Sequence, residues 1–94
     1  MELEWDEAKR LKALRDRGMD FADVARFDPA SIETFPDRRF DYGEDRFVTF
    51  GRLDGRLCIY CWTPRGTRVR VISMRKANDR ERQGYQQRQG SRHA

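Results

Sequence analysis

The chain has 94 residues, of which 38% are charged and 37% hydrophobic, and its mean hydropathy is −1.00. This length and composition allow one small core and exclude two domains. No stretch approaches the roughly 20 apolar residues that span a bilayer, and residues 1–5 lack the basic and apolar regions of a signal peptide. We therefore expect a cytoplasmic protein that does not contact the membrane.

Charge is distributed unevenly along the chain. Residues 1–44 carry eight basic and twelve acidic side chains, whereas residues 45–94 carry twelve basic and four acidic ones. Of the 20 basic residues, 17 are arginine, whose planar guanidinium pairs bidentately with phosphate. The basic half therefore favours a polyanion or an acidic protein as partner, and a solvated arginine-rich surface is the alternative.

The N-terminal third predicts a short edge strand followed by two helices. The strand is expected over residues 2–5, where apolar and acidic side chains alternate. Asp6 is placed to cap a helix that Gly18 ends. The apolar stripe expected to face the core consists of Ala8, Leu11 and Leu14. Asp20 can cap a second, shorter helix that ends before Pro29.

The rest of the chain predicts an antiparallel meander and a last helix. Residues 30–43 read as a loop or an irregular edge strand. Three strands follow, over residues 46–53, 56–63 and 67–74. Asn78 and Glu81 form a cap pair for a helix with almost no apolar stripe. The prediction is one α+β domain over residues 1–88, with its helices on one face of the sheet, and a disordered basic tail over residues 89–94.

Cys58 and Cys61 form a C-x-x-C sequence that we expect to be structural. The chain offers no second pair of ligands for a zinc ion, and its one histidine is His93. The pair also lies inside an apolar run that predicts a strand, whereas a redox pair opens a helix. Reduced thiols in the core, without a metal, are therefore expected.

Basic residues gather toward the last strand and the last helix. Arg68 and Arg70 alternate with Val69 and Val71, so the strand should have one basic and one apolar face. The residues expected to converge at one place are Arg68, Arg70, Arg75, Lys76, Arg80, Arg82 and Tyr85. Phosphoryl-transfer catalysis consists mostly of positioning and of stabilising spread negative charge, which such a cluster can supply.

Metal-free cleavage of RNA is the reaction that fits these residues. The sequence has no carboxylate cluster for Mg²⁺ and no phosphate-binding loop, so no cofactor is expected. RNA carries its own nucleophile in the 2′-hydroxyl and needs a proton acceptor, a proton donor and a clamp on the phosphate. Glu81 and Tyr85 share a helix face at the spacing i, i+4 and can exchange protons. Their structural alternatives are a helix cap and an anchor to the sheet.

Four segments occur in an order typical of one protein family. They are Glu4-Trp5-Asp6-Glu7-Ala8-Lys9, Gly43-Glu44-Asp45-Arg46, Thr63-Pro64-Arg65-Gly66 and Arg70-Val71-Ile72-Ser73-Met74-Arg75-Lys76-Ala77, the last followed by Glu81 and Tyr85. Over residues 2–85 the chain resembles the BrnT toxin family. The resemblance implies a RelE-like fold and a ribonuclease toxin that inhibits translation. It also implies a BrnA-like ribbon-helix-helix antitoxin, a heterotetramer with an antitoxin dimer, and operator DNA bound only through that complex.

The resemblance and the basic pattern together give the expected site. The residues expected to be catalytic are Arg70, Arg75, Tyr85 and Glu81. Those expected to contact RNA are Lys9, Arg46, Arg68, Lys76, Arg80 and Arg82, and Glu44 is a further family match. The first helix departs from the family pattern at Ala13, Asp16 and Arg17, where relatives carry Asn and a Lys-His pair. The missing histidine motivates a second hypothesis, a catalytically weak module that binds its antitoxin and serves in autoregulation.

Overall fold

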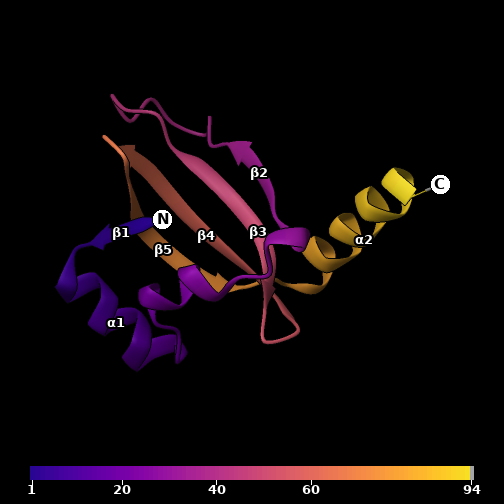
Figure 1. Cartoon of the computed structure of the whole chain (residues 1–94), viewed down its shortest axis with the longest axis horizontal. Helices are drawn as coiled ribbons and strands as arrows, with labels where there is room; N and C mark the ends of the chain where they lie inside the picture. Colours follow the sequence, from indigo (N-terminus) through magenta and orange to yellow (C-terminus); the bar gives the residue numbers. More distant parts are fainter. Residues whose placement is uncertain (94) are drawn as a thin grey trace.

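Five strands form one mixed sheet in the order β1-β5-β4-β3-β2 (Figure 1). The structure is a computed structural model that describes residues 1–93. The strands are β1 (Glu2–Trp5), β2 (Glu33–Pro36), β3 (Phe47–Leu53), β4 (Arg56–Arg65) and β5 (Arg68–Lys76). The helices are α1 (Glu7–Arg17), the 3₁₀ helices η1 (Phe21–Arg26) and η2 (Pro29–Ser31), and α2 (Asp79–His93). The α+β class and the meander β3-β4-β5 are confirmed, and β1 joins the sheet parallel to β5.

Two elements differ from the sequence prediction: the second helix and the end of the last helix. The second helix is a 3₁₀ helix. Of the two alternatives for residues 30–43, the edge strand is confirmed, since β2 pairs antiparallel with β3 at the edge of the sheet. Helix α2 continues to His93, past the expected end near residue 88, so residues 89–93 are helical where a disordered tail was expected. The last residue of that expected tail, Ala94, lies outside the described residues. No helix of the described part is long and apolar enough to cross a membrane.

The predicted helix caps form as hydrogen bonds. The Asp6 side chain accepts from the Lys9 backbone N–H at 3.2 Å, and Gly18 ends α1 in the left-handed conformation with φ 67°. At α2, the Asn78 side chain accepts from the Glu81 backbone N–H at 2.8 Å, and the Glu81 carboxylate accepts from the Asn78 backbone N–H at 3.0 Å. These bonds fix where each helix begins, and they place Glu81 in the first turn of α2.

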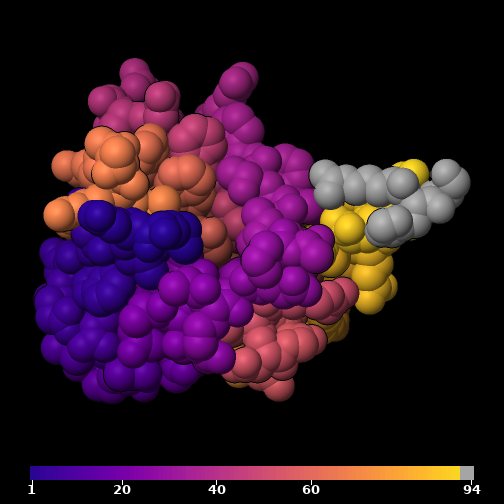
Figure 2. Space-filling model, viewed as in Figure 1, coloured from indigo at the N-terminus to yellow at the C-terminus, as the bar shows by residue number. Residues whose placement is uncertain are grey.

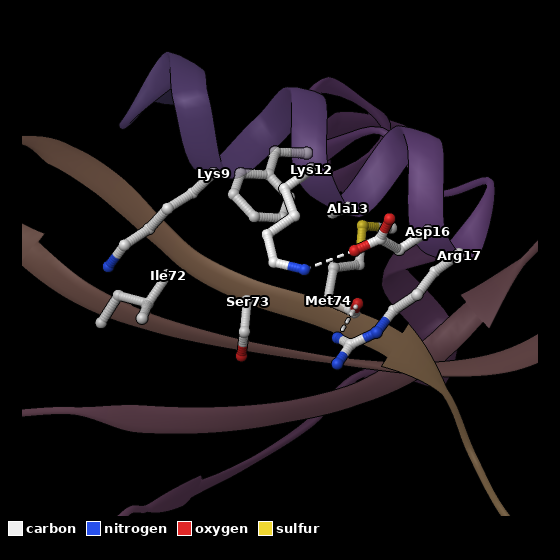
Figure 3. Close-up of a pocket in the computed structure, with 9 residues that line it drawn as sticks. Lys9, Lys12, Ala13, Asp16, Arg17, Ile72, Ser73 and Met74 are labelled. Atoms are coloured by element: carbon white, nitrogen blue, oxygen red, sulfur yellow. Dashed lines mark hydrogen bonds and ion pairs between the residues drawn. The ribbon is translucent and has the colours of Figure 1, made fainter.

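Helix α1 does not bury the apolar stripe that the sequence predicts. Leu11 and Leu14 are 49% and 41% exposed, and Ala13 is the one buried residue of the helix. The prediction of a core stripe is therefore wrong. Helix α1 instead packs on the sheet through Ala13, whose small side chain lets the helix lie close to the strands. At the C-terminal end of α1, Arg17 Nη1 donates to the Met74 carbonyl of β5 at 3.1 Å (Figure 3).

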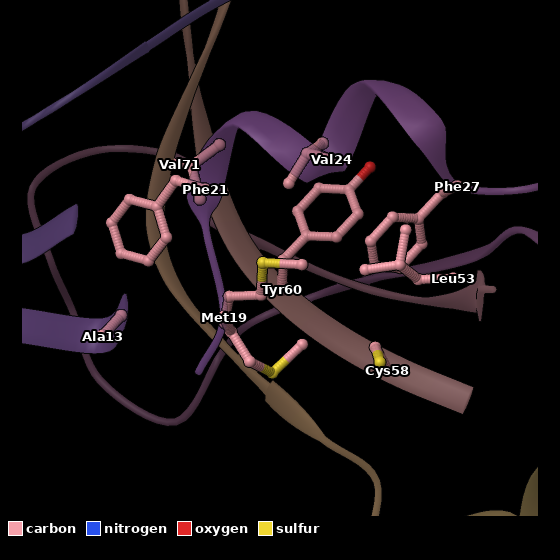
Figure 4. Packing of buried hydrophobic residues seen from close by; sticks show 10 residues of the cluster. Ala13, Met19, Phe21, Val24, Phe27, Leu53, Cys58, Tyr60 and Val71 are labelled. Atoms are coloured by element: carbon pink, nitrogen blue, oxygen red, sulfur yellow. The ribbon is translucent and has the colours of Figure 1, made fainter. Parts of the chain in front are cut away.

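The helices lie on both faces of the sheet, which corrects the expectation of one covered face. The first face, here called the α1 face, carries the larger core cluster (Figure 4): Ala13, Met19, Phe21, Val24, Phe27, Leu53, Cys58, Tyr60, Val71 and Met74. In Figure 2 the N-terminal residues, indigo to purple, cover much of the molecule on the viewed side. The opposite face, the α2 face, carries Leu57, Ile59, Ala77 and Tyr85 with Val48 and Phe50 packed against them. Alternation along β4 sends neighbouring residues into the two clusters.

A β-bulge interrupts the pairing of β4 with β5. Trp62 pairs with Val71 and Cys61 with Ser73, so Ile72 is the extra residue of β5. Because of the bulge, Ser73 shares the α2 face with Arg70 although it follows Arg70 by three residues, and Arg75 shares it at the usual spacing of two. The free thiols separate as well: Cys58 is buried in the α1-face cluster, where burial raises its pKa, and Cys61 is partly exposed on the α2 face.

Candidate functional site: a cationic groove on the sheet

A groove of about 380 Å³ lies on the α2 face of the sheet. The end of β2 and the residues after it form one wall, the first turn of α2 contributes to the other, and β3, β4 and β5 form the floor. Its lining residues are Phe35, Pro36, Asp37, Arg38, Arg39, Val48, Phe50, Ile59, Cys61, Ser73, Arg75 and Glu81. Three arginines against two carboxylates make the groove cationic.

Arg75 and Glu81 form a bidentate ion pair at one side of the groove. Arg75 Nη1 and Nη2 donate to the two Glu81 carboxylate oxygens, each at 2.7 Å. The hydrogen bonds from Arg75 lower the pKa of Glu81, and Glu81 in turn raises the pKa of Arg75. Both groups are therefore charged at neutral pH. Because Glu81 is also fixed by the α2 cap, it holds the Arg75 guanidinium at a defined place.

Arg39 is held in the same way on the wall that follows β2. Its Nε and Nη2 donate to the Asp37 carboxylate at 2.9 and 2.8 Å, and the Tyr42 hydroxyl donates to the same carboxylate at 3.2 Å. These bonds, above all those from Arg39, lower the pKa of Asp37 to about 2. The Asp37 side chain is 3% exposed whereas that of Arg39 is 67% exposed, so the carboxylate is a buried support and the guanidinium is presented to solvent.

Both guanidiniums retain hydrogen-bond donors for a ligand. A guanidinium has five N–H groups. Arg39 uses those on Nε and Nη2, which leaves its Nη1 group free of these bonds. Arg75 uses Nη1 and Nη2 toward Glu81, which leaves its Nε–H. The two charges also act on each other across the groove, since Arg39 partly opposes the rise in the pKa of Arg75. An anion between them would receive donors from both sides.

The floor of the groove beside the cations is apolar. Phe35, 39% exposed, meets Phe50 edge to face with ring centroids 5.9 Å apart. The Arg88 guanidinium lies 5.2 Å from each ring centroid. Flat apolar side chains next to guanidiniums suit a ligand that combines a planar ring with phosphate, such as a nucleotide.

Arg68 and Arg70 lie on the same sheet face, outside the groove lining. Each is paired with the glutamate opposite it on β1: Arg68 Nε donates to Glu2 at 3.1 Å and Arg70 Nη1 to Glu4 at 2.8 Å. These cross-strand pairs extend the line of guanidiniums from Arg75 toward β1 and neutralise part of its charge.

The remaining predicted RNA contacts do not line the groove. Lys9 lines a separate cleft between α1 and β5, and Lys76 lies near Cys58 on the α1 face. Arg46 donates to Glu44 at 3.0 Å and stacks 4.0 Å above the centroid of the Tyr42 ring, in the connection from β2 to β3. On α2, Arg80 is exposed, and Arg82 binds the Ala77 carbonyl at 2.8 Å and pairs with Asp79.

Tyr85 is buried rather than presented to the groove. It is 3% exposed, and its hydroxyl donates to the Ser31 carbonyl at 2.7 Å. The ring belongs to the α2-face cluster, and the Arg52 guanidinium lies 5.4 Å from its centroid. This is the anchoring alternative for Tyr85, and it leaves Arg75 and Glu81 as the two predicted catalytic residues that line the groove.

The wall formed by Asp37, Arg38 and Arg39 was not predicted from the sequence. The available signal was an acidic residue beside two arginines directly after Pro36, within a segment whose apolar pattern is lost. Ser73 and Cys61 were also missed as lining residues, because the bulge at Ile72 decides which face Ser73 occupies.

The fold is thus a small α+β domain whose sheet carries an arginine-lined groove, an arrangement that suits an anionic ligand. The family model of BrnT, the ribonuclease toxin of type II toxin-antitoxin systems, matches residues 5–81. The chain therefore belongs to the BrnT family of ribonuclease toxins. A search of curated proteins finds no match.

Proposed function

We propose that the chain is a metal-independent endoribonuclease whose active site is the groove between Arg39 and Arg75. Membership of a ribonuclease toxin family supports the substrate class. The observation that carries the location is the pair of guanidiniums that line this groove, Arg39 on the wall after β2 and Arg75 on β5 beside the first turn of α2. Each is held by its own carboxylate, and each retains N–H donors. A RelE-like fold remains part of this proposal.

The chemistry requires stabilisation of a pentacoordinate phosphorane. The 2′-oxygen of the RNA forms a bond to phosphorus, the bond from phosphorus to the 5′-oxygen breaks, and the 2′-proton leaves while the 5′-oxygen gains a proton. The products are a 2′,3′-cyclic phosphate and a 5′-hydroxyl. Donors fixed in advance, aimed at the phosphorane oxygens, typically contribute about 10²- to 10³-fold each to such rates. Arg39 and Arg75 fill this role, and Arg70 contacts a neighbouring phosphate.

Glu81 is the carboxylate next to the proposed phosphate position. Because Arg75 lowers its pKa, it is ionised at neutral pH and can accept the 2′-proton. The same hydrogen bonds make it a weak base, so electrostatic stabilisation supplies most of the rate in this proposal. Its first task is to position Arg75.

The position at which relatives carry a histidine lies outside the groove, so its replacement takes no side chain away from the proposed site. Arg17, which stands at that position, lines the cleft between α1 and β5 and binds the Met74 carbonyl. Asp16 lines the same cleft. This placement favours the enzyme over the hypothesis of an inactive module.

In the cell, the proposed cleavage inhibits translation and a cognate antitoxin blocks it. Membership of a type II toxin family supports an antitoxin partner. Following the resemblance, the partner is a BrnA-like ribbon-helix-helix protein that forms a heterotetramer with the toxin and carries the pair to operator DNA. Antitoxin contacts are not needed for the chemistry proposed above.

The test is incubation of the purified chain with a defined RNA in excess EDTA, followed by identification of the cut ends. The proposal predicts 2′,3′-cyclic phosphate or 3′-phosphate and 5′-hydroxyl ends from the wild type. Arg75→Ala should cut at least about 100-fold more slowly. The matched control is Arg56→Ala, an exposed arginine at the start of β4 outside the groove lining. Cleavage that disappears in EDTA, or an Arg75→Ala variant as fast as the control, would overturn the proposal.

A further inference from the structure

A second binding feature lies outside the groove, in a cleft between α1 and the outer edge of β5. The cleft has a volume of about 170 Å³, and its lining residues are Lys9, Lys12, Ala13, Asp16, Arg17, Phe21, Ile72, Ser73 and Met74 (Figure 3). Its inner part is apolar, from Ala13, Phe21 and Met74. A cavity of about 150 Å³ holds a benzene molecule, so this cleft can accept one apolar side chain.

The edge of β5 in the cleft has no neighbouring strand among the described residues. β1 pairs with β5 only as far as Val71. Arg17 Nη1 donates to the Met74 carbonyl at 3.1 Å, so this carbonyl points into the cleft. In an antiparallel pair the N–H and C=O of one residue point to the same side, so the Met74 N–H points there too. The Arg17 guanidinium occupies the place that the amide of an added strand would take.

Cations line the mouth of this edge. In Figure 3 the Lys9 and Lys12 side chains descend from α1 toward Ile72 and Ser73, and the Arg17 side chain descends toward Met74. Lys12 pairs with Asp16, so the cleft presents three cations against one carboxylate. A ligand that satisfies both the backbone and the charge is an extended chain with acidic side chains.

We infer that the cleft binds an extended, acidic segment of a partner protein, which adds a strand to β5 beside Ile72–Met74. One apolar side chain of that segment fills the cleft, and its carboxylates meet Lys9, Lys12 and Arg17. The inference rests on the proposed function only in taking the antitoxin as the protein that supplies the segment. It reassigns Lys9 from RNA contact to partner contact.

The cleft adjoins the groove, so a segment bound in the cleft would also hinder RNA cleavage. Ser73 lines both the cleft and the groove. A strand added along β5 therefore reaches the rim of the groove that contains Arg75. Binding of the segment would restrict access of RNA to that groove without covering it completely.

The test uses the full-length toxin and the purified cognate antitoxin in a titration. The charge-reversed variant Lys9→Glu/Lys12→Glu should bind the antitoxin at least about tenfold more weakly than wild type. Its matched control, Arg15→Glu/Arg56→Glu, reverses two exposed arginines outside the cleft lining and should bind within about twofold of wild type. Hydrogen exchange of the complex should show slower exchange at Met74 and its neighbours in β5, which side-chain contact alone would not produce.

Three outcomes overturn the inference: unchanged affinity of the cleft variant, greater weakening of the control, or protection confined to α1. Greater weakening of the control would place the antitoxin at Arg15 or Arg56 and outside the cleft. RNA cleavage without antitoxin is measured on the same variants. If the cleft variant loses cleavage and keeps its antitoxin affinity, the cleft binds RNA instead. An inactive wild type that still shows the predicted binding would refute the proposed function and leave this inference standing.

Discussion

Replacing Tyr85 by phenylalanine separates an anchoring role from a catalytic one. The substitution keeps the ring in the α2-face cluster and removes only the hydroxyl, which donates to the buried Ser31 carbonyl at 2.7 Å. A net hydrogen bond is worth about 0.5–1.5 kcal/mol, and a buried acceptor left without a donor costs about 1–3 kcal/mol. We therefore expect Tyr85→Phe to lower the free energy of unfolding by about 1–2 kcal/mol. In a domain of this size each kcal/mol corresponds to roughly 4–8 °C in Tm.

The assay pairs thermal unfolding, followed by circular dichroism, with RNA cleavage well below the Tm of both proteins. The structure predicts a lower Tm and an unchanged cleavage rate for Tyr85→Phe. Tyr85→Ala should be far less stable, by about 3–5 kcal/mol, because it also removes the ring from the core. A Tyr85→Phe variant with wild-type Tm and a large loss of cleavage would show that the Tyr85 hydroxyl acts in catalysis and does not anchor α2.

Four further substitutions test the fold and the groove. Because the folded state holds the pKa of Asp37 at about 2, below its ordinary 3.8, the carboxylate stabilises the fold above about pH 4 and this contribution is lost toward pH 2. Urea unfolding of Asp37→Asn should thus give a free energy of unfolding below that of wild type at pH 7, and this difference should shrink near pH 2.5. A difference that does not change with pH would contradict the ion pair. Gly51→Ala places a Cβ 2.7 Å from a Phe27 ring carbon, so urea unfolding should show a free energy of unfolding about 1–3 kcal/mol below that of wild type. A variant as stable as wild type would show that the core is packed more loosely there. In the same measurement, Leu11→Ala and Leu14→Ala should each lower the free energy of unfolding by less than about 1 kcal/mol, since both side chains are exposed. Losses of about 2–5 kcal/mol would show that these side chains lie in a core.

Local features of the fold were predictable because local residues cause them. The cap at Asp6, the cap pair Asn78–Glu81 and the tight turn at Asp54-Gly55, where both residues have positive φ, depend on neighbours within a few positions. The α+β class followed from these elements in order. The face of α1 that meets the sheet was not predictable in this way, because Ala13 packs through its small size, which leaves no hydrophobic signal.

The candidate site was only half predictable. The charge pattern indicated Arg75 and the cap pair indicated Glu81, but neither showed that the two side chains bind each other. The second wall needs β2 to pair with β3 so that Asp37 and Arg39 reach the groove. Tertiary pairing of this kind leaves no periodic signal in a four-residue strand that ends in proline.

Whether Arg39 and Arg75 act on one phosphate can be measured with a double-mutant cycle. Cleavage rates of Arg39→Ala, Arg75→Ala and the double variant are measured against Arg56→Ala, with folding of each checked by its Tm. We expect each single variant to cleave about 10²- to 10³-fold more slowly. The double variant should lose far less than the product of the two single losses, because residues that act on one group are not additive. Multiplicative losses, or single variants as active as Arg56→Ala, would contradict this expectation.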